Sequence, residues 1–306
     1  MAVNTALSIL NRIRKGAFSP DYLLLPFALL MTAISIVFFK RLQPPCLLIL
    51  ADLFVVSVLL YLIFLEARGE TNSIAYFLHT WLPVISLTLF YVQSTSYDHL
   101  VFTTTFDNLL MRWEEALFGK LNRFAGIPGR YLLLDELFHF FYFSYYIILF
   151  VPGLIMMARR SAKLHEMVFS LTLMMFAHYL VFILFPGDGP VARRPDIFQH
   201  GAVFIPLMNW IYTIGGEQGG GAFPSTHVTV TVMVLLYCRT EFPGSRWLFG
   251  ILAIGICVAT IYCSYHYIVD TLAGLATGTA FFFIGRKIYP IRMIQTNQSG
   301  GSISHR

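Results

Sequence analysis

The run YLLLDELFHFFYFSYYIILFVPGLIMM, residues 131–157, is apolar over a length that decides the class of fold. A helix of about 20 apolar residues crosses the hydrocarbon core of a bilayer, and this run is longer than that. The whole chain has the same character, since 57% of its 306 residues are hydrophobic and only 12% are charged. A soluble domain would have to bury nearly every helix, so we predict an integral membrane protein.

Further apolar runs flank this one and predict an all-α, polytopic transmembrane helical bundle of about eight spans. The predicted spans are residues 22–39, 46–65, 74–93, 131–157, 164–186, 223–239, 247–263 and 267–285. We interpret the first as a membrane anchor, because it is long and lacks the small-residue cleavage site of a signal peptide. The cysteines show no C-x-x-C spacing and are interpreted as packing residues: Cys46, Cys238, Cys257 and Cys263.

Residues 98–130 contain an amphipathic pattern in place of a span. Apolar side chains recur there at helical spacing, at Phe106, Leu109, Leu110, Trp113 and Leu117. Charged side chains lie opposite them, at Asp107, Arg112, Glu114 and Glu115. The pattern predicts a helix that lies in the membrane interface, and a plain connector packed on the bundle is the alternative.

The distribution of basic residues predicts the orientation of the bundle. Eight spans put both termini on one side, and that side carries 13 of the 21 lysines and arginines, including Arg12, Arg14 and Lys15. The excess predicts cytoplasmic termini, although Lys40 and Arg41 on the other side oppose it. The net charge of +5 suits contact with anionic lipid, and the basic residues form no stripe that would favour a nucleic-acid partner.

The stretch TIYCSYHYIVD, residues 260–270, contains ionisable groups at a span, where their cost makes them functional candidates. His266 and Asp270 are four residues apart and would share one face of a helix. An aspartate that accepts a hydrogen bond from one ring nitrogen leaves the other nitrogen free as a nucleophile or base. A purely structural His–Asp pair is the alternative.

The stretch GGGAFPSTHVTV, residues 219–230, opens the sixth predicted span with a glycine-rich hinge. Pro224 suits the first turn of a helix, because proline has no N–H group to lose. The N–H groups of Ser225, Thr226 and His227 would then point at an anion, helped by the helix dipole. The hinge therefore predicts an anion cradle with an imidazole at its rim.

The loop FPGDGPVARRPDIF, residues 185–198, adds two adjacent arginines, Arg193 and Arg194. Arginine binds phosphate bidentately, whereas the alternative is a basic loop that touches lipid head groups. We expect all three stretches to emerge on one face of the membrane. Two histidines, a carboxylate, arginines and a helix N-terminus that converge there are typical of phosphoryl transfer through a histidine.

The stretch LLLDELFHFFYFSYY, residues 132–146, carries polar groups at helical spacing: Asp135, His139, Tyr142 and Tyr146. They could form a wall of a lipid or headgroup pocket, or an aromatic belt with a satisfied core pair. Two other histidines in predicted spans are interpreted as satisfied buried residues: His79 and His178.

In these residues the chain resembles the type 2 phosphatidic acid phosphatase superfamily, over roughly residues 130–285. The pattern of that family is K-x6-R-P, then P-S-G-H, then S-R-x5-H-x3-D. The corresponding residues of this chain are Arg194–Pro195, then Pro224–Ser225–Thr226–His227, then His266 and Asp270.

The chain departs from the family pattern at two cations. Gly187 stands where the lysine is expected, and Ala259 and Thr260 stand where Ser-Arg is expected. Together with the stretches GAFPSTH and TIYCSYHYIVD, the missing cations make the chain more similar to the inositol phosphorylceramide synthase-like (inositolphosphotransferase) branch of the family. The stretch FDNLLMRWEEALFG resembles the bacterial relatives of that branch.

The resemblance implies an integral-membrane enzyme that acts on lipid phosphates through a phosphohistidine intermediate. It would release phosphate as a lipid phosphatase or pass a phospho-headgroup to another alcohol as a transferase. The implied nucleophile is His266, with Asp270 orienting its ring and His227 protonating the leaving alkoxide. The groups implied to hold the phosphate oxygens are Arg194, Arg193, Ser225 and Thr226.

The resemblance implies no metal and no other cofactor, and membrane lipids are the expected partners, without an obligate protein partner. The expected location is a bacterial inner membrane, with the active site facing the periplasm or outside. The expected organisation is transmembrane helices in 1–97, the interfacial segment in 98–130, a phosphatase-like core of about six helices in 131–288 and a disordered polar tail in 289–306.

Two other functions are compatible with the same residues. One is a non-catalytic protein that binds or carries lipid phosphates, because two cations of the family pattern are missing. The other is a metalloenzyme, since His227, His266 and Asp270 are formally a two-His-one-carboxylate set. A phosphodiester carries one negative charge and needs fewer cations than a monoester, which favours headgroup transfer.

Overall fold

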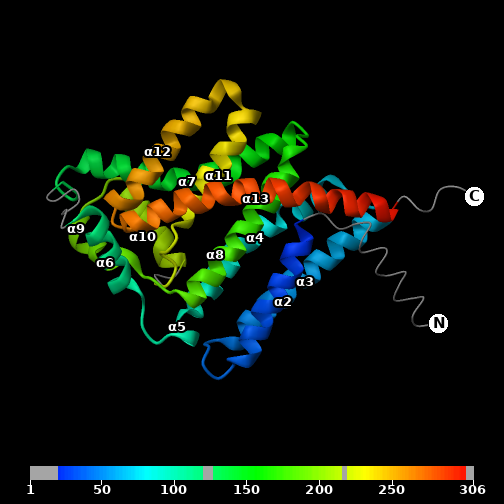
Figure 1. Ribbon diagram of the computed structural model, residues 1–306, viewed down its shortest axis with the longest axis horizontal. Coiled ribbons are helices and arrows are strands. Elements are labelled where there is room, and N and C mark those ends of the chain that lie inside the picture. The colour runs from blue at the N-terminus through cyan, green and yellow to red at the C-terminus, as the bar shows by residue number, and fades with distance from the viewer. Residues whose placement is uncertain (1–19, 120–126, 216–218, 301–306) are drawn as a thin grey trace, which may run out of the picture. The chain divides into compact units, whose positions relative to one another are not determined.

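The computed structural model describes residues 20–119, 127–215 and 219–300 (Figure 1). Its elements in chain order are α2 Asp21–Val37, α3 Pro45–Arg68, α4 Ser73–Ser96, α5 Asp98–Val101, α6 Asp107–Phe118, α7 Leu132–Ala158, α8 Lys163–Leu184, η1 Gly189–Arg193, α9 Arg194–Ile197, α10 Phe204–Gly215, α11 Thr226–Glu241, η2 Pro243–Ser245, α12 Arg246–Tyr262 and α13 Ile268–Gly300. Over these ranges there is no strand, only an isolated bridge between Gly187 and Gly221. The all-α prediction is confirmed.

Each of the predicted spans coincides with a helix, and the chain is an integral membrane protein. Six helices of the described part are long and apolar enough to cross a membrane: α3, α4, α7, α8, α12 and α13. The other two predicted spans correspond to α2, with 17 residues, and α11, with 16 residues. Helix α11 begins only at Thr226, because the glycine-rich hinge and the residues Pro224 and Ser225 precede it, and it is therefore shorter than the predicted span.

Some parts of the chain differ from the prediction. The apolar helix α10, Phe204–Gly215, was not predicted. Helix α13 continues to Gly300, so it includes residues that the sequence assigned to a disordered tail, whereas 301–306 lie outside the described residues. Arg12, Arg14 and Lys15 lie outside them too.

The chain divides into two compact units. The first comprises residues up to 93, residues 162–176 and residues from 283 onward, and the second comprises 94–161 and 177–282. In the first unit, Phe27 stacks on Phe176 with ring centroids 3.9 Å apart. A buried pair also lies there, in which His79 Nε2 is 2.8 Å from Asp21 Oδ2, as expected of a satisfied histidine.

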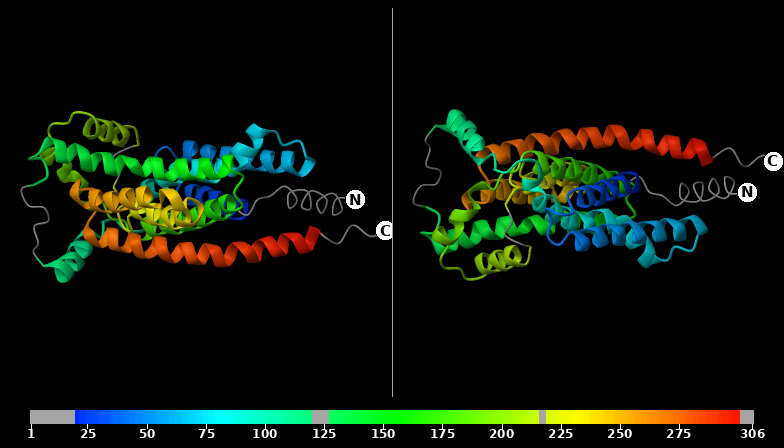
Figure 2. Two further views of the ribbon diagram at one scale, coloured as in Figure 1. Left: turned by 90° about the horizontal axis from the view of Figure 1, so that it is seen from above. Right: turned by 90° about the horizontal axis from the view of Figure 1, so that it is seen from below.

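The second unit contains all of the predicted site residues. Helix α7 packs against α10, α11 and α12, and α11 also packs against α12. Figure 1 and Figure 2 show that α7 and the first part of α13 run in roughly the same direction, whereas α12 is oblique to them in Figure 1. The prediction of a satisfied histidine is wrong for His178 in this unit, since neither ring nitrogen has a hydrogen-bond partner in the described ranges and the ring lies beside Phe182 and Phe281.

Glycines allow α13 to lie very close to α11. A Cβ atom on Gly274 would lie 2.8 Å from the carbonyl oxygen of Ser225, and one on Gly278 would lie 2.6 Å from that of Thr229. Small residues permit this backbone approach between membrane helices. The approach matters for the site, because it brings the first turn of α11 against the first turn of α13.

Alanine at Gly278 should therefore lower the free energy of unfolding by about 1–3 kcal/mol, because its Cβ meets backbone that cannot rotate away. Alanine at Gly250 in α12, where no atom lies within 4 Å of the new Cβ, is the matched control. It should be neutral or stabilise by up to about 1 kcal/mol. Thermal unfolding of both variants in detergent measures the difference, and similar melting temperatures would contradict this packing.

Candidate active site

The turn between α12 and α13 presents His266. The carbonyl oxygen of Thr260 accepts hydrogen bonds from the N–H groups of both Tyr265 and His266, each at 3.0 Å. Ser264 adopts a left-handed conformation, with φ of 56°, that reverses the chain. The short link between the last two predicted spans is therefore a tight turn, held by one backbone carbonyl of α12.

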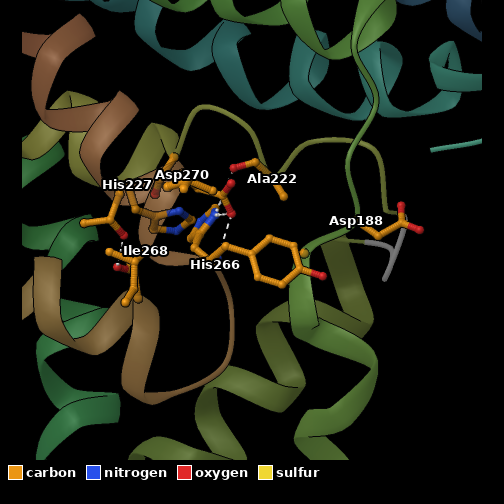
Figure 3. Close-up of polar contacts among 12 residues, drawn as sticks. Asp188, Ala222, His227, His266, Ile268 and Asp270 are labelled. Carbon is orange, nitrogen blue, oxygen red and sulfur yellow. Dashed lines mark hydrogen bonds and ion pairs between the residues drawn. The ribbon is translucent and has the colours of Figure 1, made fainter. Parts of the chain in front are cut away.

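The imidazole of His266 is oriented mainly by a backbone carbonyl (Figure 3). Its Nδ1 lies 3.0 Å from the oxygen of Ala222 and 3.6 Å from Oδ2 of Asp270. A carbonyl can only accept, so Nδ1 carries the hydrogen and Nε2 keeps its lone pair. The sequence had assigned this orienting role to Asp270 alone, whose Oδ2 instead accepts the N–H of Tyr267 at 2.7 Å.

The carboxylate of Asp270 is completely buried beside this ring. Its Oδ1 has no hydrogen-bond partner among the residues that the structure describes, and its Oδ2 is the oxygen 3.6 Å from Nδ1 of His266. A buried negative charge at this distance stabilises a positive charge on the imidazole. The buried carboxylate and the imidazole are therefore close enough to form an ion pair when the ring is protonated.

The second imidazole, that of His227, lies next to the first (Figure 3). The ring centroids of His227 and His266 are 6.0 Å apart. Two tyrosines of α7 contact the His227 ring, Tyr142 at 4.5 Å and Tyr145 at 4.3 Å between centroids. The Tyr142 hydroxyl is 3.4 Å from His227 Nδ1 and 2.8 Å from the hydroxyl of Tyr212. The contact leaves the other ring nitrogen of His227 as the one available to a ligand.

The first turn of α11 differs in its hydrogen bonds from the three free amides that the sequence predicted. The N–H of Ser225 donates to the carbonyl of Asp270 at 3.1 Å, so it is not available to an anion as the sequence suggested. The side chain of Ser225 is fully buried, and in the described part of the chain its Oγ has no hydrogen-bond partner. The N–H groups of Thr226 and His227 belong to the first turn, where no intrahelical acceptor exists. One hydroxyl and two amides therefore take the place of three amides.

Arg194 is buried and its guanidinium is largely occupied. Its Nε donates to the carbonyl of Cys263 at 3.0 Å, and Nη2 lies 3.3 Å from His139 Nε2 and 3.5 Å from Asn209 Oδ1. The guanidinium carbon lies 3.8 Å from the ring centroid of Tyr265. Arg194 therefore braces the turn before His266.

Arg193 differs from its neighbour because it is exposed. It interacts electrostatically with Tyr267, the residue after His266. The two arginines that the sequence treated as one pair thus have different surroundings, and Arg193 is the one open to a ligand.

The four predicted pocket residues divide into two pairs. Asp135 accepts hydrogen bonds from the hydroxyl of Tyr262 at 2.8 Å and the N–H of Gly129 at 3.1 Å, and its carbonyl oxygen is 2.7 Å from His139 Nδ1. Asp135 and His139 are therefore a satisfied core pair. Tyr142 contacts His227 directly, and Tyr146 is half-buried.

Glu136 was missed by sequence reasoning. Its carboxylate accepts the N–H groups of Ala202, Val203 and Phe204 at 2.6, 3.1 and 2.6 Å, where α10 begins. A carboxylate at a helix N-terminus is favourable, and here it ties α10 to α7. Its presence in a predicted span was a signal, because ionisable residues there need partners.

Helix α6 contributes carboxylates that the sequence placed on a polar face without a partner. Glu114 is buried, and it accepts the N–H groups of Ile268 and Val269 at the start of α13. Trp113 and Leu117 on a neighbouring stripe of the helix are exposed. The amphipathic pattern was correct, but part of its polar face points into the protein.

The arrangement suits a tetrahedral oxyanion. The imidazoles of His266 and His227, the buried hydroxyl of Ser225 and the first-turn amides belong to the adjoining starts of α11 and α13, and groups of these kinds can contact oxygen or phosphorus atoms. In the described ranges, no group of three or more His, Cys, Asp or Glu residues is arranged to hold a metal ion.

Comparison with known proteins gives two matches. A family model described as the PAP2 superfamily matches residues 108–284, more than half of the chain. The inositol phosphorylceramide synthase catalytic subunit aur1 of Schizosaccharomyces pombe is 31% identical over 81 residues, which are 26% of this chain and 19% of that protein. The match thus spans about a fifth of the length of that curated relative. No solved structure gives a significant match.

Lysine at Arg194 should destabilise the protein by about 1–3 kcal/mol, because an ammonium group cannot stack on Tyr265 while also bonding Cys263 and Asn209. Lysine at the exposed neighbour Arg193 is the matched control and should change stability by less than about 0.5 kcal/mol. Thermal unfolding of the two purified variants measures this. Equal melting temperatures would show that Arg194 does not brace the turn.

Proposed function

Because this chain belongs to the PAP2 superfamily, we propose that it transfers phosphoryl groups of membrane lipids through a phosphohistidine on His266. At the family level the chain is a membrane protein of the lipid phosphatase and phosphotransferase class. One observation carries the finer proposal. The rings of His227 and His266 lie 6.0 Å apart, and the buried carboxylate of Asp270 is 3.6 Å from Nδ1 of His266.

In the first step, Nε2 of His266 attacks the phosphorus atom, and a P–N bond forms as the bond to the leaving oxygen breaks. The hydrogen bond from Nδ1 to the carbonyl of Ala222 supports this step, because it leaves Nε2 deprotonated. His227 gives its proton to the leaving alkoxide. Asp270 stabilises the positive charge that the His266 ring gains.

We assign the phosphate oxygens to the first turn of α11. The Oγ of Ser225 supports this assignment because it is buried and no described residue hydrogen-bonds to it, and the amides of Thr226 and His227 are first-turn donors. Arg193 is the cation that this proposal gives to the phosphate, because it is exposed near the His266 turn. Arg194 supplies positive charge from behind the turn.

In the second step, a hydroxyl oxygen attacks the phosphorus, His227 accepts the proton of that hydroxyl, and the P–N bond to His266 breaks. Water as the nucleophile gives a lipid phosphatase, and another alcohol gives a headgroup transferase. Gly187 and Thr260 replace the two cations of the phosphatase pattern, which favours a phosphodiester with its single negative charge. The name of the curated relative, a synthase subunit, favours the transferase too.

We further propose that the termini lie in the cytoplasm of a bacterial cell and that the site faces the periplasm or outside. The lysine and arginine excess on the side of the termini supports this orientation. The contacts among the hinge, the His266 turn and the arginine loop support a single shared face, since all three belong to the second unit.

Alanine at His266 or at His227 should abolish turnover of lipid phosphates. Loss of the nucleophile removes the covalent route, and loss of the general acid reduces the rate by about 10²–10⁴-fold. The measurement is phosphate release or headgroup transfer by purified protein in detergent, with EDTA present. The exposed His200, replaced with alanine, is the matched control and should leave activity unchanged.

Full activity of both catalytic variants would refute the assignment. Tight binding of lipid phosphates by wild-type protein without any turnover would indicate a carrier. Activity that is lost in EDTA and restored by one metal would indicate a metalloenzyme.

Water labelled with ¹⁸O distinguishes the two acceptors. The weak cation complement predicts a transferase, so released or transferred phosphate should carry no ¹⁸O when a lipid alcohol is supplied. Mass spectrometry of the product measures the label. Stoichiometric ¹⁸O in free phosphate, unaffected by added alcohol, would instead identify a phosphatase.

A further inference from the structure

Helix α6 carries two carboxylates on one face, Asp107 and Glu114, which the reaction steps do not use. They are seven residues apart and therefore two helical turns apart on the same side of the helix. Glu114 is only 1% exposed, although the next residue, Glu115, is exposed. A buried carboxylate beside an exposed one on the same helix indicates a specific partner for the buried group.

The partner of Glu114 is the beginning of α13. Its Oε1 accepts the N–H of Ile268 at 3.2 Å, and its Oε2 accepts the N–H of Val269 at 3.1 Å. Both amides lie in the short segment between His266 and Asp270 (Figure 3). Glu114 is also close enough to Asp270 for their charges to interact. A single carboxylate thus holds the segment that links the two members of the His–Asp pair.

The second carboxylate, Asp107, connects α6 to the arginine loop, residues 185–198. It accepts the N–H groups of Asp188 and Gly189 at 2.9 and 2.8 Å. It also accepts a hydrogen bond from the hydroxyl of Tyr267; burial and this carboxylate raise the pKa of Tyr267, so the phenol remains a donor. Asp188 in turn accepts the N–H of Gly220 at 2.8 Å. The acidic face of α6 therefore connects with all three polar loops of the site.

From these contacts we infer that Glu114 is a positioning residue for His266, which fixes the His266–Asp270 segment and adds a second negative charge near the His–Asp pair. The inference rests on the proposed role of His266 as nucleophile. The two hydrogen bonds hold the first turn of α13, so Asp270 keeps its place 3.6 Å from the ring. The negative charges of Glu114 and Asp270 both favour the cationic ring that forms in the phosphohistidine.

Replacing Glu114 with Gln tests the inference, since the amide keeps one acceptor oxygen and loses the charge. We expect kcat to fall about 10- to 100-fold, as for other lost positioning contacts, with KM for the lipid phosphate within about twofold of wild type. Without this charge the protonated ring is less stable, so the rising limb of the pH–rate profile should move to lower pH. The other titratable groups beside the ring, Asp270 and His227, are unchanged in this variant.

Two further variants control the experiment. Glu115→Gln removes the same charge from the exposed neighbour and should have wild-type kcat and pH profile. Glu114→Asp keeps the charge with a shorter reach, so the limb of the pH profile should return to its wild-type position. The amount of ³²P-labelled phosphohistidine gives the number of active sites in every preparation, which separates lost rate from lost protein.

A Glu114→Gln variant with the kcat and pH profile of the wild type would overturn the inference. The inference would also be overturned if the variant had fewer labelled active sites but an unchanged rate per labelled site. These outcomes leave the assignment of His266 standing, because wild-type protein would still form the labelled intermediate. Absence of any label in wild-type protein would refute the proposed function instead.

Discussion

The hydrogen bond from Nδ1 of His266 to the carbonyl oxygen of Ala222 is the constraint on which the rest of the site depends. It joins the turn before α13 to the hinge before α11, and it fixes which ring nitrogen is free. A second link runs between the same segments in the opposite direction, from the N–H of Ser225 to the carbonyl of Asp270. Gly274 lets α13 approach α11 closely. Both hydrogen bonds can therefore form, and the rings of His227 and His266 lie 6.0 Å apart. The relative position of the two imidazoles thus depends on backbone hydrogen bonds that hold the starts of α11 and α13 together.

The sequence predicted the long apolar helices and the proximity of His266 and Asp270, for identifiable reasons. Long apolar runs have one stable form in a bilayer, and the four-residue spacing of His266 and Asp270 suggested their proximity before any coordinates. The sequence did not predict contacts in which the partner of a side chain is a backbone atom or a residue far away in the chain. No pattern in Ala222 or Thr260 indicates an accepting carbonyl. Glu114 and Glu115 are equivalent in the sequence, and only the fold buries one and exposes the other.

The residues that replace the expected cations have structural contacts of their own. Thr260 accepts two N–H groups of the turn through its carbonyl, and its hydroxyl lies 3.1 Å from that of Thr271. Gly187 accepts the N–H of Ala222 at 2.9 Å, and a Cβ atom there would lie 3.1 Å from a methyl group of Leu110. A Cβ atom at residue 187 would need the Leu110 side chain to shift by a few tenths of an ångström, and Thr260 is fully buried, so a longer side chain there would need new space. The reduced positive charge of the site is therefore built into how closely its loops pack.

The carbonyl of Ala222 has a consequence for how such proteins diverge. A main-chain oxygen is present whatever side chain the residue bears, so mutation can change residue 222 without removing the acceptor that sets the tautomer of the imidazole. Natural selection at residue 222 then acts on the backbone conformation and on the space available to the side chain, not on a chemical group of that side chain. Two descendants could share an identical imidazole geometry while their sequences disagree at the residue that enforces it.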